Sequence, residues 1–172
     1  MLTGQKRCRE VFSTRQILPN GEICSVVAEV SFVFIRYMIY PDRDKEKATA
    51  FLGSMRRVAP GLGVNLAEPR HISMQGNRSG DYMTQLAKLI PTGPEMIFCV
   101  VPNDKGDQYA AIKKKCCIEQ PVPSQVVTVS KVLNKEKGYM SMATKVVTQM
   151  ACKMGAEPWA LEIPFKGAMV IG

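Results

Sequence analysis

The sequence predicts an α/β fold with a mostly parallel central sheet and helices on both faces of the sheet. Apolar, β-branched runs typical of strands alternate along the chain with segments of helical periodicity. One run, 96–101 (MIFCVV), is apolar at every position, as in a strand buried on both faces. At 172 residues the chain is long enough for one domain with a buried core.

The expected elements can be placed in chain order. The run 30–40 is rich in β-branched and aromatic residues and ends at Pro41, so it is a predicted strand. A helix follows to about Val58 and ends in the Pro-Gly segment 59–63. Residues 1–29, with a turn signal at 18–21, are expected to be a linker or short hairpin before a domain at 30–172. The remaining predicted helices are 81–89, 109–116 and 140–154, and the remaining predicted strands are 63–66, 96–101, 125–129, 159–163 and 168–171.

Composition and charge narrow the class of function. The net charge of +8 favours a polyanionic partner. No apolar run is as long as a membrane span and the N-terminus lacks the apolar region of a signal peptide, so we expect an intracellular protein without membrane contact. Six cysteines without a CxxC pair, together with a single histidine, give no zinc-site pattern. That histidine, His71, has no serine or cysteine arranged beside it as a nucleophile and is expected to be a surface or partly packed residue.

Two pairs of residues suggest a phosphate site. Tyr109 and Lys113 lie four apart in a predicted helix, and so do Gln149 and Lys153 in another, so each pair shares a helix face. Gln125 begins the short strand between the two helices. The N-terminus of the helix after Pro102 would favour an anion, and an aromatic ring beside a lysine suits a terminal nucleotide. Two other interpretations stay open: a tyrosine that covers apolar core, and a lysine run that is a solvated helix face.

Several ordered motifs resemble a known family. They are STRQILPNGEI (13–23), IYPDRDKEKATAFLGSMRRVAPGLGV (39–64), YAAIKKKCC (109–117), PVPSQVV (121–127), ATKVVTQMACKMGAEPW (143–159) and IPFKGAMVIG (163–172). Together they closely resemble the MID domain of Argonaute proteins, in particular the PIWI clade, which binds piRNAs. The resemblance implies a Rossmann-like fold. It also implies a module that anchors the 5′-monophosphorylated first nucleotide of a guide RNA for germline gene and transposon silencing, joined to the other domains of a parent protein.

The resemblance assigns roles to the two pairs. In the family a Tyr-Lys-Gln-(Lys or Gln)-Lys set holds the 5′ end of the guide. By this pattern Tyr109 stacks on the first base, and Lys113, Gln125 and Lys153 bind the phosphate. The family's specificity loop, which implies a preference for 5′-uridine, corresponds to Asn103, Asp104, Lys105, Gly106, Asp107 and Gln108.

Gln149 stands where the other eukaryotic Argonautes have lysine and the PIWI clade has a neutral polar residue. In that clade Mg²⁺ is recruited at this position. A divalent cation would neutralise phosphate charge that a missing lysine leaves, so Gln149 is the expected Mg²⁺ contact. The C-terminal carboxylate that helps hold the metal in this clade is not among these residues.

The resemblance also bears on catalysis and location. In the family, the last strand leads almost at once to the first catalytic aspartate of the RNase H-like PIWI domain. The chain ends at Gly172 before such a residue, so we expect a binding module without a nuclease centre, acting in the cytoplasm, perinuclear germ granules or the nucleus.

Two other functions are open on the sequence. One is a small α/β domain that binds or acts on a phosphorylated metabolite, with Asp104, Asp107 or Glu119 as the only acid–base candidates. The other is a protein-binding face on the helix at 43–58 or on 1–29, which carry no ligand motif.

Overall fold

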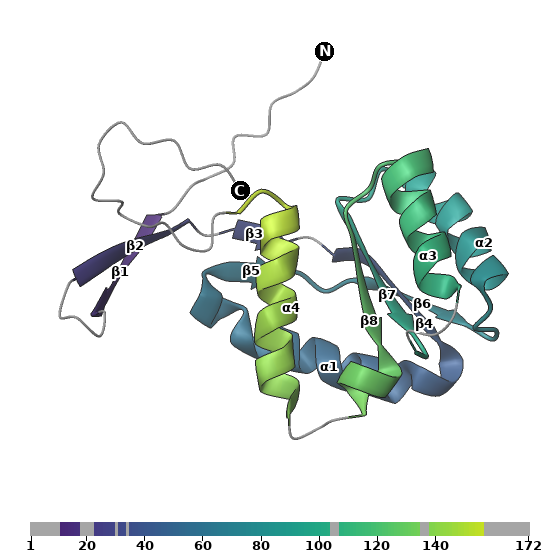
Figure 1. Ribbon diagram of the computed structural model, residues 1–172, viewed down its shortest axis with the longest axis horizontal. Helices are drawn as coiled ribbons and strands as arrows, with labels where there is room; N and C mark the ends of the chain where they lie inside the picture. The colour runs from purple at the N-terminus through teal and green to yellow at the C-terminus, as the bar shows by residue number, and fades with distance from the viewer. Residues whose placement is uncertain are drawn as a thin grey trace, which may run out of the picture.

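The computed structural model describes residues 11–17, 23–29, 31–33, 35–103, 107–134 and 138–156, with side chains from Ile35 onward (Figure 1). The predicted strands at 159–163 and 168–171 lie outside these residues.

A parallel sheet of four strands forms the centre of the domain. In spatial order the strands are β6 (Arg70–Met74), β4 (Ile35–Pro41), β7 (Met96–Val101) and β8 (Ser124–Thr128), and every neighbouring pair is parallel. Every residue of β7 is buried, as its unbroken apolar run predicts. Among the described residues β8 is the outermost strand of this sheet, so one side of its backbone has no strand partner within them.

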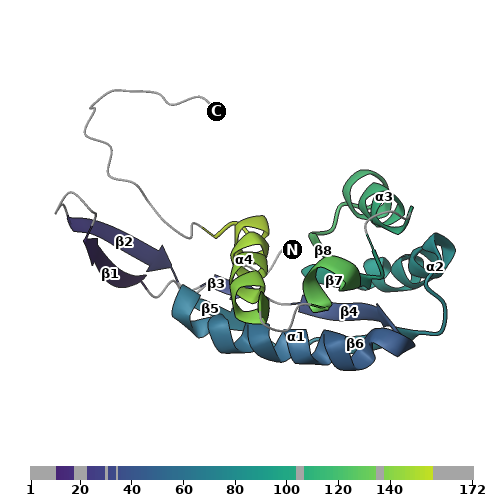
Figure 2. The same ribbon diagram turned by 60° about the horizontal axis from the view of Figure 1, so that its bottom comes forward.

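Helices cover both faces of this sheet, which confirms the predicted fold class (Figure 2). One face packs against α1 (Lys45–Val58) and α4 (Tyr139–Lys153), and the other packs against α2 (Ser79–Leu89) and α3 (Gln108–Lys113). Strand residues alternate between the two cores. Met38 and Phe98 belong to the first core, whereas Ile39 and Cys99 belong to the second.

The remaining elements are short. The strands β1 (Val11–Ile17) and β2 (Ile23–Glu29) form an antiparallel hairpin, which is the hairpin alternative expected for 1–29. A pair of parallel strands joins β3 (Ser31–Val33) to β5 (Val64–Leu66). In the described ranges, 3₁₀ turns lie at Asp42–Asp44, Pro60–Leu62 and Ile90–Thr92, and π-helical segments lie at Lys114–Glu119 and Val129–Leu133.

Two strand predictions need correction. The predicted strand 30–40 is two strands, β3 and β4, in different sheets, and the pairing of β4 with β7 shifts register between Ile35 and Tyr37. A run of apolar letters does not reveal such a change of partner. The strand β6 was not among the predicted strands, because three of its five side chains are exposed, which leaves little alternation to detect. Its His71 lies on the surface, 3.3 Å from Glu68 Oε1 and edge-on to the Tyr40 ring, in agreement with the prediction.

Two helix boundaries also differ from the predicted ones. The helix α2 begins at Ser79, two residues before the predicted start, because the Asp81 carboxylate accepts a hydrogen bond from the Arg78 N–H at 2.9 Å. The predicted helix 109–116 keeps α geometry only through Lys113 and then widens into the π-helical segment Lys114–Glu119. The end of α4 agrees with expectation, since Gly155 follows it with φ 83°.

Candidate functional site

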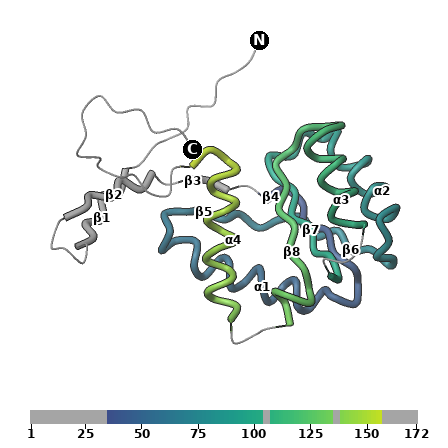
Figure 3. Tube along the Cα trace, viewed as in Figure 1, coloured from purple at the N-terminus to yellow at the C-terminus, as the bar shows by residue number. Residues whose placement is uncertain are grey.

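The predicted site residues converge beside the open edge of the sheet. Figures 1 and 3 show β8 lying between α3 and α4. The first residue of β8 is Ser124, and the last residues of α3 and α4 are Lys113 and Lys153. The tertiary fold therefore brings together side chains separated by up to 40 positions at the amino end of one edge strand.

The backbone of β8 explains why lysines gather there. The Pro123 carbonyl accepts a hydrogen bond from the Ile97 N–H of β7 at 3.0 Å. Successive residues of a strand direct their backbone groups to opposite sides, so the Ser124 carbonyl faces the open edge. A buried carbonyl without a strand partner needs another donor, and the two lysines provide it.

Both lysine ammonium groups bind Ser124. Lys113 Nζ donates to the Ser124 carbonyl oxygen and to Ser124 Oγ, both at 2.9 Å. Lys153 Nζ donates to the same carbonyl oxygen at 3.0 Å and to Gln125 Oε1 at 2.6 Å. Two cations are thus held as close neighbours around one oxygen atom.

Two glutamine amides complete the cluster. Gln125 Nε2 donates to Gln149 Oε1 at 3.2 Å, which links β8 to α4. Ser124 and Gln125 are buried, whereas Gln149 is exposed. We call Lys113, Ser124, Gln125, Gln149 and Lys153 the lysine–amide cluster.

No carboxylate of the described residues pairs with the lysines of the cluster. Among the described residues, no acidic side chain forms an ion pair with Lys113 or Lys153; the ion pairs that do form are Arg43–Asp44, Arg56–Glu68, His71–Glu68 and Lys115–Glu119. Burial, and then repulsion from the Lys113 ammonium, lower the pKa of Lys153 below its ordinary value. A bound anion would relieve this repulsion.

Tyr109 supplies an aromatic surface at one side of the cluster. Its side chain is 51% exposed, and Lys113 Nζ lies 6.0 Å from the centre of its ring. That distance is at the outer limit of a cation–π contact. About half of the residue is covered and half is exposed, so Tyr109 both covers apolar surface and leaves ring surface on which a base could stack.

Hydrogen-bond donors remain for a ligand. An ammonium group has three N–H donors, and each lysine uses two of them on the acceptors named above, so each keeps one. Within the described part of the chain, Gln125 uses one amide N–H, on Gln149 Oε1, and keeps the other, and neither N–H of Gln149 has an acceptor. The cluster is therefore rich in donors and positively charged, as an anion-binding site requires.

The location of the cluster differs from one expectation. The N-terminus of the helix after Pro102 was expected to contribute to anion binding, but Lys113 and Lys153 belong to the last turns of their helices. Lys153 ends α4, where the partial negative charge of a helix C-terminus stabilises a lysine, whereas the helix that carries Lys113 continues through Lys114–Glu119.

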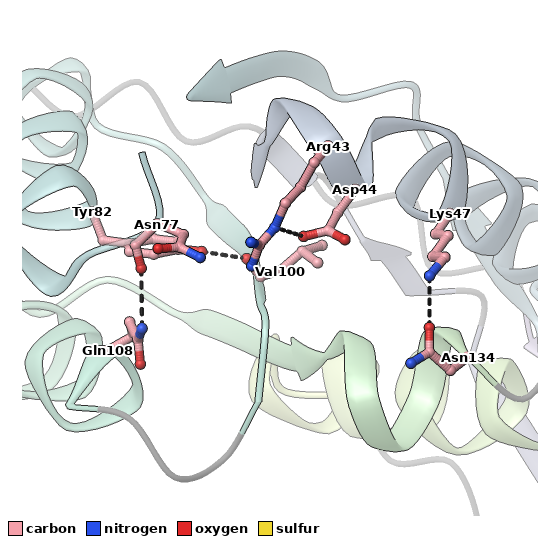
Figure 4. A network of polar contacts seen from close by, with 8 residues as sticks. All are labelled: Arg43, Asp44, Lys47, Asn77, Tyr82, Val100, Gln108 and Asn134. Atoms are coloured by element: carbon pink, nitrogen blue, oxygen red, sulfur yellow. Dashed lines mark hydrogen bonds and ion pairs between the residues drawn. The ribbon is translucent and has the colours of Figure 1, made fainter. Parts of the chain in front are cut away.

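The expected specificity loop lies at the other end of α3. Asp104, Lys105 and Gly106 are outside the described residues, while Asn103, Asp107 and Gln108 are within them. Gln108 Nε2 donates to the Asn77 carbonyl at 3.0 Å and so ties the start of α3 to the loop before α2 (Figure 4). In the same view the buried Tyr82 hydroxyl donates to the Val100 carbonyl at 2.7 Å.

One member of the cluster, Ser124, was not predicted. Its neighbour Gln125 was identified through a family motif, and Ser124 offers no charge or spacing that would mark it. The sequence does contain one indication: a small polar residue follows Pro-Val-Pro at the start of the strand. In an edge strand the backbone groups that face away from the sheet need hydrogen-bond partners.

The oxygen ligands that the cluster offers fit Mg²⁺ only in part. Mg²⁺ prefers hard oxygen ligands, usually one or two carboxylates together with phosphate oxygens. Gln149 Oε1 is such an oxygen, but within the described ranges no three His, Cys, Asp or Glu side chains cluster as a metal site. The protein groups seen here would hold Mg²⁺ only if a bound phosphate supplied further ligands.

The acid–base candidates for an enzyme are dispersed. Glu119 accepts from Lys115 Nζ at 2.8 Å, and this pairing lowers the pKa of its carboxyl group. Asp107 is exposed at the start of α3, and Asp104 lies outside the described residues. Neither described carboxylate hydrogen-bonds to a member of the lysine–amide cluster. None of the described helices is long and apolar enough to span a bilayer.

Comparison with known proteins agrees with this architecture. A Piwi domain family model matches residues 96–172. The chain is 36% identical to Protein piwi of Drosophila melanogaster over 78% of its own length and 16% of that protein. It is also 36% identical to Protein argonaute-3 of the same organism over 89% of its length and 17% of that protein. The chain thus spans about one sixth of these relatives.

Solved structures show the same relationship. The crystal structure of Drosophila Piwi superposes with a TM-score of 0.71 at 34% identity and covers 77% of this chain and 18% of that one. The Arabidopsis thaliana AGO5 MID domain has the same fold, with a TM-score of 0.57 at 22% identity over 73% of this chain and 91% of that domain. A structure described as Aa-Ago with externally bound siRNA also shares the fold, with a TM-score of 0.60 at 15% identity over 90% of this chain and 25% of that one. The chain therefore belongs to the Piwi clade of the Argonaute proteins and contains their MID domain.

Proposed function

We propose that the lysine–amide cluster binds the 5′-monophosphate of a guide small RNA and that Tyr109 stacks on its first base. The observation that carries this proposal is the convergence of Lys113 and Lys153 on one carbonyl oxygen, without a described acidic partner. Two such cations repel each other until an anion binds between or beside them. The family to which the chain belongs makes a small RNA the natural source of that anion.

The number of N–H donors in the cluster favours a terminal phosphate over an internal phosphodiester. A terminal monophosphate has three non-bridging oxygens and a charge near −2 at neutral pH. An internal phosphodiester has two such oxygens and a single charge. The unused N–H groups of both lysines and both glutamines match the larger number of acceptors and the larger charge.

The central test compares two RNAs that differ only at the 5′ end. A short RNA with a 5′-phosphate and the same RNA with a 5′-hydroxyl are titrated against the protein by fluorescence anisotropy. Charge-assisted hydrogen bonds contribute about 1.5–3 kcal/mol each, so we expect the phosphorylated RNA to bind at least roughly 100-fold more tightly. Equal affinities would remove the assignment of the cluster as a phosphate site.

We further propose that residues 103–108 select uridine as the first base. The anchoring of Gln108 to Asn77 supports this, because it fixes one end of that loop close to Tyr109. NMR titration with UMP, AMP, GMP and CMP measures the preference directly, and UMP should bind most tightly. Four equal affinities would contradict the selectivity while leaving phosphate binding intact. Recovery of unchanged UMP after prolonged incubation would distinguish binding from an enzyme that acts on phosphorylated metabolites.

For the parent protein we propose RNA-guided silencing of genes and transposons in the germline, in the cytoplasm, germ granules or nucleus. In this arrangement the chain anchors the guide, Mg²⁺ supports the phosphate through Gln149, and cleavage belongs to residues of the parent protein beyond this chain.

A further inference from the structure

We propose that Ser124 is a positioning residue that preorganises both lysines for phosphate binding. The inference rests on the proposed function and extends it to a residue that touches the lysines directly. Ser124 is the only described residue that accepts hydrogen bonds from both ammonium groups.

The backbone and the side chain of Ser124 bind the lysines in different ways. The carbonyl oxygen accepts from both lysines, and any residue at position 124 could provide it. The hydroxyl accepts a second bond from Lys113 at 2.9 Å, which only a side chain with an acceptor atom at that place can provide. The hydroxyl and the carbonyl together fix the position of the Lys113 ammonium, and only the hydroxyl depends on the identity of residue 124.

The surroundings make this position rigid. Ser124 is buried and pairs with Ile97 of the fully buried strand β7. Lys113, by contrast, is a long side chain with about 2 kcal/mol of rotamer entropy to lose. When a rigid acceptor fixes a flexible donor in advance, the ligand does not bear that entropic cost on binding. We infer that the hydroxyl raises affinity for the phosphate by holding Lys113 in place.

A hydrogen-bonded Lys113 still has a donor for the ligand. Two of its three N–H groups point to Ser124, and the third is unused within the described part of the chain. Fixing two donors also restricts the direction of the third. Position 124 thus sets both the place and the orientation of one phosphate contact.

The test compares Ser124→Ala, Ser124→Thr and Ser124→Cys with the unchanged chain. Ser124→Ala removes the hydroxyl, and we expect affinity for the 5′-phosphorylated RNA to fall roughly tenfold while affinity for the 5′-hydroxyl RNA stays unchanged. Ser124→Thr retains the hydroxyl on a residue suited to a strand and should restore most of the affinity. Ser124→Cys keeps the volume with a weak acceptor and should behave like alanine, which keeps the test valid if the alanine variant does not fold.

The outcomes separate this inference from the proposed function. Lys153→Glu in the same titration reports on the site itself. If Lys153→Glu abolishes phosphate selectivity while Ser124→Ala and Ser124→Cys retain it in full, the positioning role is wrong and the phosphate site stands. If Ser124→Ala weakens both RNAs equally and lowers Tm, Ser124 is merely structural and the inference is also wrong. If Lys153→Glu has no effect, the proposed function itself fails.

Discussion

The ammonium groups of Lys113 and Lys153 share one acceptor, the main-chain carbonyl oxygen of Ser124, at 2.9 and 3.0 Å. This relationship places two positive charges at the open edge of a parallel sheet. The carbonyl dipole offsets part of their repulsion, Gln125 Oε1 accepts from Lys153 Nζ, and Gln125 Nε2 donates to Gln149 Oε1. The arrangement gives the basic chain a defined point at which phosphate charge can be neutralised.

Reversal of one charge should abolish binding at this point. In Lys153→Glu a carboxylate replaces the ammonium beside Gln125, so a charge-assisted bond is lost and a repulsive charge is added. We expect affinity for 5′-phosphorylated RNA to fall by at least about 100-fold in an anisotropy titration. Because Lys153 also donates to the buried Ser124 carbonyl, Tm is measured in parallel, and the expected result is a folded variant that no longer distinguishes the two RNAs.

Lys145→Glu is the matched control for this variant. Lys145 is exposed on the same helix and eight residues earlier, which places it roughly 12 Å away along the helix axis. The same change in net charge should there lower affinity only slightly and for both RNAs alike. A loss of equal size in the two variants would indicate general electrostatic attraction and contradict a specific site.

The pH dependence of phosphate binding should be bell-shaped. As pH rises through about 6 the phosphate gains its second charge and affinity should increase. At high pH Lys153 loses its proton, and affinity should fall. Because the pKa of Lys153 is lowered by burial and by Lys113, that fall should begin below the ordinary range for lysine.

The sign of the linked stability effect is also fixed. A lysine whose pKa is lower in the folded than in the unfolded state binds fewer protons when folded, so the free energy of unfolding should rise with pH across the interval between the two values. The pH dependence of phosphate binding is measured by isothermal titration calorimetry from pH 5 to 10. A decline at high pH that is identical in Lys153→Gln would show that another group titrates.

Mg²⁺ should strengthen binding only in the presence of phosphate. Gln149 offers one neutral oxygen and no charge, so a divalent cation can neutralise phosphate at this side of the cluster. We expect affinity for 5′-phosphorylated RNA to increase with Mg²⁺ and to fall when EDTA is added. Gln149→Lys supplies a cation of its own and should bind equally well under both conditions. Equal response to Mg²⁺ in both proteins would exclude Gln149 as the contact.

Two glycines should respond oppositely to alanine. A Cβ on Gly76 would meet the Asp81 carboxylate, which caps the Arg78 N–H at the start of α2. Gly76→Ala should therefore displace that cap and lower the free energy of unfolding by roughly 0.5–2 kcal/mol. Gly53 lies exposed within α1 with open space around the Cβ position. Gly53→Ala should therefore raise the free energy of unfolding by roughly 0.5–1 kcal/mol. Urea denaturation measures both, and a stabilising Gly76→Ala would contradict the close approach of Asp81.

The amino-acid sequence by itself determined the fold class and predicted most of the candidate site. The alternation of strand and helix patterns, with the unbroken apolar run of β7, is a local property that periodicity reports. Tyr109, Lys113, Gln125, Gln149 and Lys153 were identified through motifs that each lie within a short segment.

Only the tertiary structure decided how these residues meet. The split of the run 30–40 between two sheets depends on partners that lie far away in sequence. Ser124 became visible because β8 is an edge strand, and whether a strand lies at an edge depends on the order of all strands in the sheet. Because of this strand order the Ser124 carbonyl faces away from β7, and lysines from two helices donate hydrogen bonds to it. This convergence results from the packing of segments far apart in the sequence, so no local pattern predicts it.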